Sequence, residues 1–196
     1  MNDQDTRRRS YRRFSVDAPS LPVVLVGMMG VGKSSIGRRL ASRIGLPFID
    51  SDAEIEAAAG RSIVEIFEEF GEAAFRDGER RVLARLIDGR PAVIATGGGA
   101  FIDDETRALI KARALSVWLD ADLAILLERT ARRDTRPLLL EGDPGETLRR
   151  LKSEREAIYR QADIHVRSGD GPHDAVVAQI LEALEGRVVE IEETSP

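Results

Sequence analysis

The sequence predicts an α/β fold with three layers, α/β/α, around a central, mainly parallel five-stranded sheet. Short apolar runs alternate with longer helical patterns from Leu21 onward, and this alternation is typical of crossover units that build a parallel sheet. The first apolar run leads into a glycine-rich loop that a helical pattern follows at once. Since parallel strands end at one edge of such a sheet, we expect the residues that follow the strands to share one site.

The expected elements begin and end at local signals. Gly45 and Gly60 are expected to end helices. Ser62 and Glu65 form a capping box that opens the next helix. That helix is expected to stop near Gly71, and a further helix is expected over 72–87. The expected strands are 23–26, 46–50, 92–96, 115–119 and 164–166, and the other expected helices are 35–44, 52–59, 104–112, 122–132, 146–160 and 174–184.

The segment Gly27–Ser34 fits the pattern G-x-x-x-x-G-K-[ST] at every fixed position. In a phosphate-binding loop of this kind, backbone N–H groups and the start of the following helix surround the phosphates. Lys33 is expected to reach the β- and γ-phosphates, and the Ser34 hydroxyl to ligate Mg²⁺. The alternative is a chance glycine turn, but the flanking strand and helix favour a nucleoside triphosphate site.

Composition excludes some other classes of protein. The chain has 196 residues, of which 42% are hydrophobic, enough for one domain. It has no cysteine, which excludes disulfides and cysteine-ligated metals. No apolar run approaches the roughly 18 residues of a transmembrane helix, and the net charge of −5 does not indicate a nucleic-acid partner. We therefore expect neither a nucleic acid nor a membrane as partner.

The domain boundaries are predicted from composition. Residues 1–20 are rich in arginine and poor in apolar residues, which favours a disordered tail over a basic arm for nucleic acid or anionic lipid. Residues 21–186 are expected to form a single domain and 187–196 a C-terminal tail. The polar stretch 133–145 is interpreted as a lid hinged at Gly142 and Gly145, with an ordinary surface loop as the alternative.

Polar and glycine residues follow three of the expected strands. Of Asp50 and Asp52, one is expected to hold Mg²⁺ through water and the other to orient a substrate hydroxyl and accept its proton. The alternative for Asp52 is a helix cap. Gly97–Gly99 would offer backbone N–H groups to a ligand, unless they form only a tight turn. Asp120 is interpreted as a helix-start residue.

Six segments together resemble the shikimate kinase family, in the nucleoside-monophosphate-kinase-like group of P-loop NTPase folds. They are GMMGVGKSSIGRRLA, FIDSD, FRDGE, ATGGGA, RPLL and REAIY, within a match over about residues 21–185. The resemblance implies transfer of the γ-phosphate of ATP to the 3-hydroxyl of shikimate, in the pathway to chorismate and the aromatic amino acids. It further implies Mg²⁺ as cofactor and a cytoplasmic enzyme, for which we expect a monomer.

The resemblance also implies roles for individual residues. Asp52 would bind the shikimate hydroxyls and accept the proton, Arg76 and Arg155 would hold the carboxylate, and Gly98 would contact the substrate through its backbone. The ATP-binding set that it implies is Gly30, Val31, Gly32, Lys33, Ser34, Ser35 and the lid residue Arg136. Lys33 and Arg136 would act with Asp52 in catalysis, and the metal would lie at Ser34 and, through water, at Asp50.

Two other functions remain as alternatives. A kinase for another small polyol acid, such as gluconate, would share the phosphate loop, but GGG and RPLL favour shikimate. A nucleotide-binding switch would need a base reader such as Asn-Lys-x-Asp, and the only asparagine is Asn2. The segment 167–172 has no clear equivalent of the adenine-stacking arginine of some family members, so the sequence does not identify the residues that bind adenine.

Overall fold

The computed structural model describes residues 21–131 and 143–193. Its sheet has the strand order β2-β3-β1-β4-β5, and each neighbouring pair is parallel. The strands are β1 (Val23–Val26), β2 (Phe48–Asp50), β3 (Val93–Ala95), β4 (Leu115–Asp120) and β5 (Ile164–Arg167). The predicted parallel five-stranded sheet is therefore confirmed.

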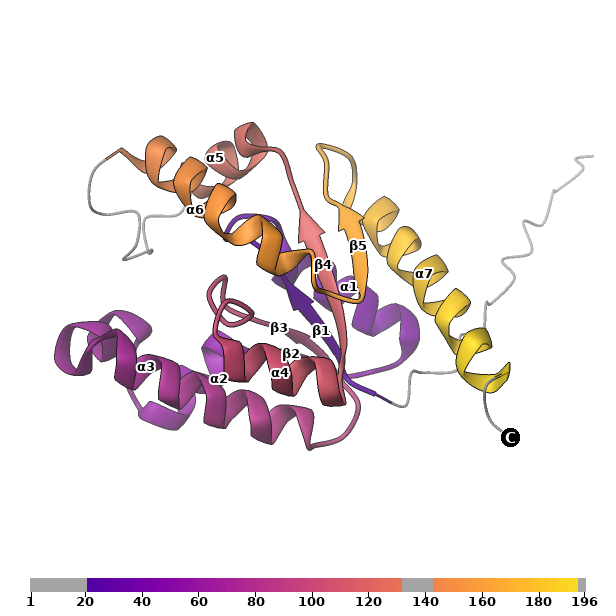
Figure 1. Cartoon of the computed structure of the whole chain (residues 1–196), viewed down its shortest axis with the longest axis horizontal. Helices are drawn as coiled ribbons and strands as arrows, with labels where there is room; N and C mark the ends of the chain where they lie inside the picture. Colours follow the sequence, from indigo (N-terminus) through magenta and orange to yellow (C-terminus); the bar gives the residue numbers. More distant parts are fainter. Residues whose placement is uncertain (1–20, 132–142, 194–196) are drawn as a thin grey trace, which may run out of the picture.

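Helices cover both faces of this sheet. They are α1 (Lys33–Ile44), α2 (Ser51–Ala59), α3 (Ile63–Ile87), α4 (Asp104–Arg113), α5 (Leu123–Ala131), α6 (Pro144–Tyr159) and α7 (His173–Glu193). Helix α1 contacts α7 on one face, while α3 contacts α4 and α5 contacts α6. Figure 1 shows the sheet between α1 and α7 on one side and α3, α4 and α6 on the other. The three-layer prediction is confirmed.

The central strand explains why the sheet forms where it does. All four residues of β1 are fully buried, between β3 and β4. A strand that is covered by helices on both faces reads as a continuous apolar run instead of an alternating one, as the sequence VVLV does. This burial fixes the strand that leads directly into the phosphate loop.

Several helix ends follow their predicted local signals. Gly45 and Gly60 take left-handed backbone conformations just after α1 and α2, and the capping box of Ser62 and Glu65 opens α3. At Gly71 the backbone leaves helical geometry, with φ 79° and ψ 174°, so that α3 is two helical stretches joined at a kink. The predicted stop near Gly71 and the second helix after it are thus confirmed.

Most predicted ends differ from the structure by two residues or fewer, but two predictions at the ends of elements are clearly wrong. Asp120 does not start a helix: it is the last residue of β4, because its carbonyl accepts a hydrogen bond from the Ser168 amide, and its carboxylate contacts Lys152 of α6. The last helix does not stop at residue 184, because α7 continues to Glu193, into the segment that we expected to be a tail. No helix of the described ranges is long and apolar enough to cross a membrane.

The proposed lid falls largely outside the described residues. Residues 132–142, with Arg136 and Gly142, are not part of them, and neither is the predicted tail 1–20. Helix α6 begins at Pro144, with the Asp143 side chain as its cap, so Gly145 belongs to the first turn of a helix. Pro at the first helical position favours this start, since its missing N–H would have no partner there.

Candidate active site

The phosphate loop joins β1 to α1 through a backbone that glycine permits. Gly27 has φ +132°, and a side chain there would collide with the Leu119 carbonyl of β4. Gly32 is the residue before α1 and has no side chain to cap it. The first N–H groups of α1 are therefore offered to a ligand, with the partial positive charge of a helix N-terminus.

Lys33 brings a full positive charge into this loop. Its side chain is only 9% exposed, and Nζ donates hydrogen bonds to the carbonyls of Gly27 (2.7 Å) and Met28 (2.9 Å). The ammonium group is thus held across the loop by the backbone. A phosphate bound by the N–H groups of α1 would lie beside this cation.

Asp50 connects the phosphate loop to α2. The Ser34 hydroxyl donates to Asp50 Oδ2 at 2.8 Å, while Asp50 Oδ1 accepts from the amide of Asp52 at 3.2 Å and so caps α2. The capping role that was an alternative for Asp52 belongs to Asp50. Asp52 lies in the first turn of α2 instead.

A cavity of about 870 Å³ runs along the carboxyl edge of the sheet. The predicted site residues that line it are Gly30, Gly32, Lys33, Ser34, Ser35, Asp50, Asp52, Arg76, Gly98 and Arg155. Val31 differs, because its side chain is fully buried in the core and only its backbone belongs to the loop. Arg136 lies outside the described residues.

A buried carboxylate holds one of the arginines that line the cavity. Glu79 is fully buried, and its Oε2 accepts from Arg76 Nη1 at 2.6 Å. Burial raises the pKa of Glu79 above its ordinary range, and Arg76 opposes this shift. A side chain on Gly97 would come within 2.9 Å of Asp52 Oδ1 and 3.1 Å of Glu79 Oε1, so both carboxylates converge on the first glycine after β3.

The second arginine reaches the same glycine loop from α6. Arg155 Nη1 donates to the Gly98 carbonyl at 3.3 Å, and the Tyr159 hydroxyl donates to the same oxygen. Figure 1 shows α6 and α3 on opposite sides of the loop that follows β3. Arg76 of α3 and Arg155 of α6 therefore approach the end of the cavity from two sides. Two fixed guanidinium groups are suited to bind a carboxylate.

Sequence reasoning missed four residues around this cavity. Glu79 could have been found, because it lies three residues after Arg76 and so on the same helix face. Tyr159 lies four residues after Arg155 on one helix face and could have been found in the same way, whereas Arg129 and His173 had no comparable signal. Arg129 donates to the carbonyls of Val31 (3.3 Å) and Gly169 (3.0 Å), which adds a cation beside the phosphate loop.

His173 lies at the same end of the cavity as Arg129. Burial lowers the pKa of His173 below its ordinary range, and the positive charges of Arg39 and Arg129 act in the same direction. The imidazole is therefore held towards its neutral form, next to a loop that is already rich in positive charge.

Comparison with known proteins agrees with this geometry. A model of the protein family described as Shikimate kinase matches residues 29–185. This chain belongs to the shikimate kinase family. A shikimate kinase of Bradyrhizobium diazoefficiens is 59% identical over 162 residues, which are 83% of this chain and 78% of that protein. One of Paramagnetospirillum magneticum is 60% identical over 162 residues, 83% of each.

Solved structures give the same family. A shikimate kinase from Acinetobacter baumannii, in complex with shikimate, superposes with a TM-score of 0.83 at 37% identity, over 87% of this chain and 96% of that one. A gluconokinase from Sinorhizobium meliloti has a TM-score of 0.63 at 18% identity, over 90% of this chain and 98% of that one, and shares the fold alone. The predicted family and P-loop NTPase fold are confirmed.

Proposed function

We propose that this shikimate kinase family member transfers the γ-phosphate of ATP to the 3-hydroxyl of shikimate, giving 3-phosphoshikimate and ADP. One observation carries the assignment of the site: a single cavity is lined by the phosphate loop with Lys33 and also by Asp52, Arg76 and Arg155. Phosphoryl transfer needs its two substrates held close together and in line, more than it needs covalent chemistry from the protein.

The phosphate loop would bind ATP. The backbone of Gly30, Val31 and Gly32 and the hydroxyl residues that begin α1, Ser34 and Ser35, are proposed to surround the phosphates. Lys33 is proposed to leave the two carbonyls that hold it for the β- and γ-phosphate oxygens. Its charge would then stabilise the negative charge that develops on the transferring group.

ATP-using kinases generally require a divalent cation, and we propose Mg²⁺. The oxygens of Ser34 and Asp50, 2.8 Å apart, are ligands of the kind that Mg²⁺ prefers, with Asp50 acting through water. Among the described residues no three acidic or histidine side chains gather at a metal site, which fits an ion held by few protein ligands. When bound, Mg²⁺ would neutralise charge on the phosphate oxygens.

The acceptor would bind beside Asp52, Arg76 and Arg155, which line the same cavity. Arg76 and Arg155 are proposed to hold the shikimate carboxylate with their planar guanidinium groups, and Gly98 to contact the substrate through its backbone. Asp52 is proposed to bind the hydroxyl that attacks and to accept its proton as general base. A polyol acid matches this set, because it carries one carboxylate and several hydroxyls.

Water must be excluded during transfer, because it would otherwise hydrolyse ATP. From the sequence we propose that the part of the predicted lid that precedes α6, residues 133–143, closes over the site and that Arg136 then meets the phosphates as a catalytic residue. We also propose that the enzyme is a monomer. We further propose that it is cytoplasmic, and a chain without cysteine is compatible with such a reducing compartment.

A parallel assay tests the proposal. ADP release from Mg-ATP is measured with shikimate, with gluconate and without acceptor. We expect shikimate alone to stimulate release and to become phosphorylated. Stimulation by gluconate without stimulation by shikimate would overturn the substrate assignment, and equal slow hydrolysis in all three arms would indicate a nucleotide switch.

A further inference from the structure

Tyr159 is a buried residue at the end of α6 whose hydroxyl reaches the glycine loop. The side chain is 1% exposed, and its ring stacks on Trp118 of β4 with the centroids 6.1 Å apart. Trp118 in turn packs against His165, with the two rings nearly perpendicular. Because packing holds the ring, the hydroxyl is presented to the Gly98 carbonyl from one fixed direction.

The Gly98 carbonyl accepts two donors from one face of one helix. Tyr159 and Arg155 lie four residues apart on α6, which places them one turn apart on the same face. Both donate to the same oxygen. Since a trans peptide is planar, fixing this carbonyl also fixes the Gly99 N–H in the opposite direction. Helix α6 thereby sets the orientation of the glycine loop.

The two side chains that donate to Gly98, Tyr159 and Arg155, differ in what else they can bind. Burial raises the pKa of Tyr159 to about 12, so the phenol keeps its proton and remains a donor over the working pH range. Arg155, in contrast, lines the cavity and is one of the two arginines that we propose for the substrate carboxylate. If the hydroxyl were removed, Arg155 would lose its own contact with it and would be the one of these two donors left at the Gly98 carbonyl, so the position of its guanidinium would change.

We propose that Tyr159 is a positioning residue for the acceptor substrate: its hydrogen bond to the Gly98 carbonyl orients the glycine loop and leaves the Arg155 guanidinium available to the substrate carboxylate. This inference rests on the proposed function. It predicts an effect mainly on shikimate binding, because the Tyr159 hydroxyl donates to the glycine loop and not to the phosphate loop itself.

Tyr159→Phe tests this with the loss of one oxygen atom, since the ring that packs on Trp118 is kept. We expect the KM and the calorimetric Kd for shikimate to rise about threefold to tenfold, the range for loss of one neutral hydrogen bond. The KM for ATP should stay unchanged. A wild-type KM for shikimate in an active Tyr159→Phe enzyme, or an equal rise for both substrates, would overturn the proposal.

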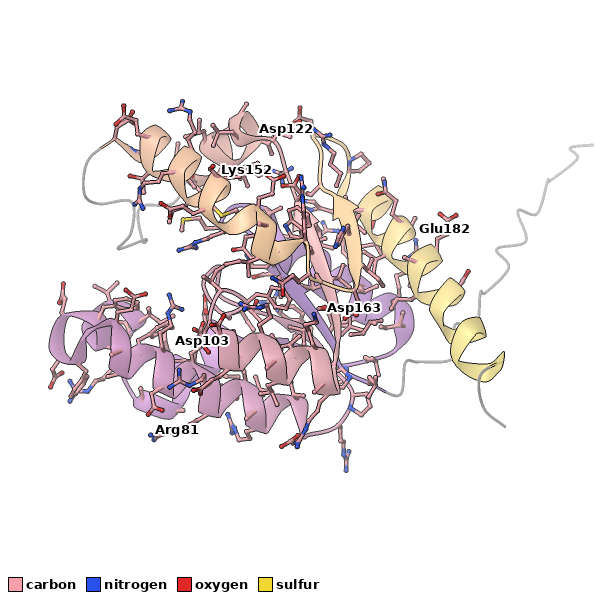
Figure 2. All side chains as sticks on the ribbon, viewed as in Figure 1. Arg81, Asp103, Asp122, Lys152, Asp163 and Glu182 are labelled. Carbon is pink, nitrogen blue, oxygen red and sulfur yellow. The ribbon has the colours of Figure 1, made fainter. Side chains whose placement is uncertain are left out.

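Ser116→Ala is the matched control, because it also removes a buried hydroxyl from a hydrogen bond. Ser116 Oγ donates to Asp163 at 2.6 Å, and Asp163 lies just before β5, at the amino end of the sheet (Figure 2). We expect a lower Tm and an unchanged KM for shikimate. A rise in the shikimate KM equal to that of Tyr159→Phe would mean that general loosening, and not the Gly98 contact, explains the effect.

A second measurement keeps the ring and its hydroxyl. The chain has two tyrosines, Tyr11 and Tyr159, so a Tyr11→Phe protein labelled with 3-fluorotyrosine has one ¹⁹F resonance. We expect shikimate to shift this resonance, and the concentration that gives half of the shift should equal the midpoint of the calorimetric titration. No shift at saturating shikimate would contradict the proposal. Failure of the proposed function looks different, because the wild-type enzyme would then show no shikimate-dependent ADP release.

Discussion

The Arg76 guanidinium donates to Glu79, with Nη1 2.6 Å from Oε2, and Glu79 is fully buried. This pair sets the direction of Arg76, whose other amino group contacts the exposed Glu72. Removing one member of a buried ion pair lowers the stability of the folded protein strongly, since the remaining charge loses its partner. The orientation of Arg76 towards the cavity thus depends on a residue that does not itself need to contact substrate.

Glu79→Gln should raise the KM for shikimate while leaving the KM for ATP near the wild-type value. Glutamine keeps the shape of the side chain but not the charge that directs Arg76, so we expect a rise of roughly tenfold, the cost of one charge-assisted hydrogen bond. Steady-state kinetics with each substrate varied in turn measure it. An unchanged shikimate KM would mean that Arg76 is oriented without Glu79.

The raised pKa of Glu79 has a consequence for stability. The folded protein keeps a proton on Glu79 at pH values where the unfolded chain, with a pKa of about 4.3, has released it. Stability therefore falls as pH rises from about 4.3 through the raised pKa of the folded state. We expect Glu79→Gln to lack this contribution, which urea unfolding of both proteins across a pH series would measure. Parallel pH profiles would contradict it.

Asp52→Asn should lower kcat by roughly 10²–10⁴-fold, the usual contribution of a general base. Helix α2 should survive this change, because Asp50 and not Asp52 caps it. ATP binding, measured by calorimetry, should therefore persist. A kcat near that of the wild type would remove Asp52 from the role of proton acceptor.

Ser34→Ala should raise the Mg²⁺ concentration needed for half-maximal activity. The hydroxyl is the one direct protein ligand that we propose for the ion, and its loss also deprives Asp50 Oδ2 of its hydrogen bond at 2.8 Å. Activity is titrated with Mg²⁺ at a fixed concentration of ATP. An identical Mg²⁺ dependence in both enzymes would show that Ser34 does not hold the metal.

The predictable parts of this molecule are those that local sequence specifies. The phosphate loop and the capping box at Ser62 each depend on residues within a few positions of one another, and the comparisons and the structure agree with them. Asp120 shows where such reasoning fails. Its backbone joins the sheet through Ser168, 48 positions further along the chain, and no local pattern reveals that pairing.

The same limit explains the missed site residues. Arg129 and His173 reach the phosphate loop because α5 and α7 are packed beside it, and neither is part of a motif. Tyr159 belongs to the segment REAIY, but its contact with the glycine loop depends on a carbonyl 61 positions earlier in the chain. Residue chemistry and strand ends predicted which edge of the sheet carries the site, whereas tertiary packing determines which further side chains complete it.

The last prediction concerns the pair of arginines that we propose for the substrate carboxylate. Hydrogen bonds to a charged group contribute roughly 1.5–3 kcal/mol net, so Arg76→Ala or Arg155→Ala should weaken shikimate binding about tenfold to a hundredfold. Arg76→Lys should not restore it, because a point charge cannot replace the planar fork. Arg150→Ala is the control: it lies on α6 as Arg155 does, but it is exposed and pairs with Glu154, so the shikimate KM should not change.

Shikimate methyl ester distinguishes a carboxylate site from a merely structural arginine pair. The ester has the ring and hydroxyls of shikimate without its negative charge, so it should be a poor acceptor for the wild-type enzyme. The ratio of kcat/KM for acid and ester should shrink in Arg76→Ala and in Arg155→Ala, because each variant loses part of what recognises the charge. Equal turnover of acid and ester by the wild type would mean that no carboxylate is bound there, and that Arg76 and Arg155 serve only to hold α3 and α6 against the glycine loop.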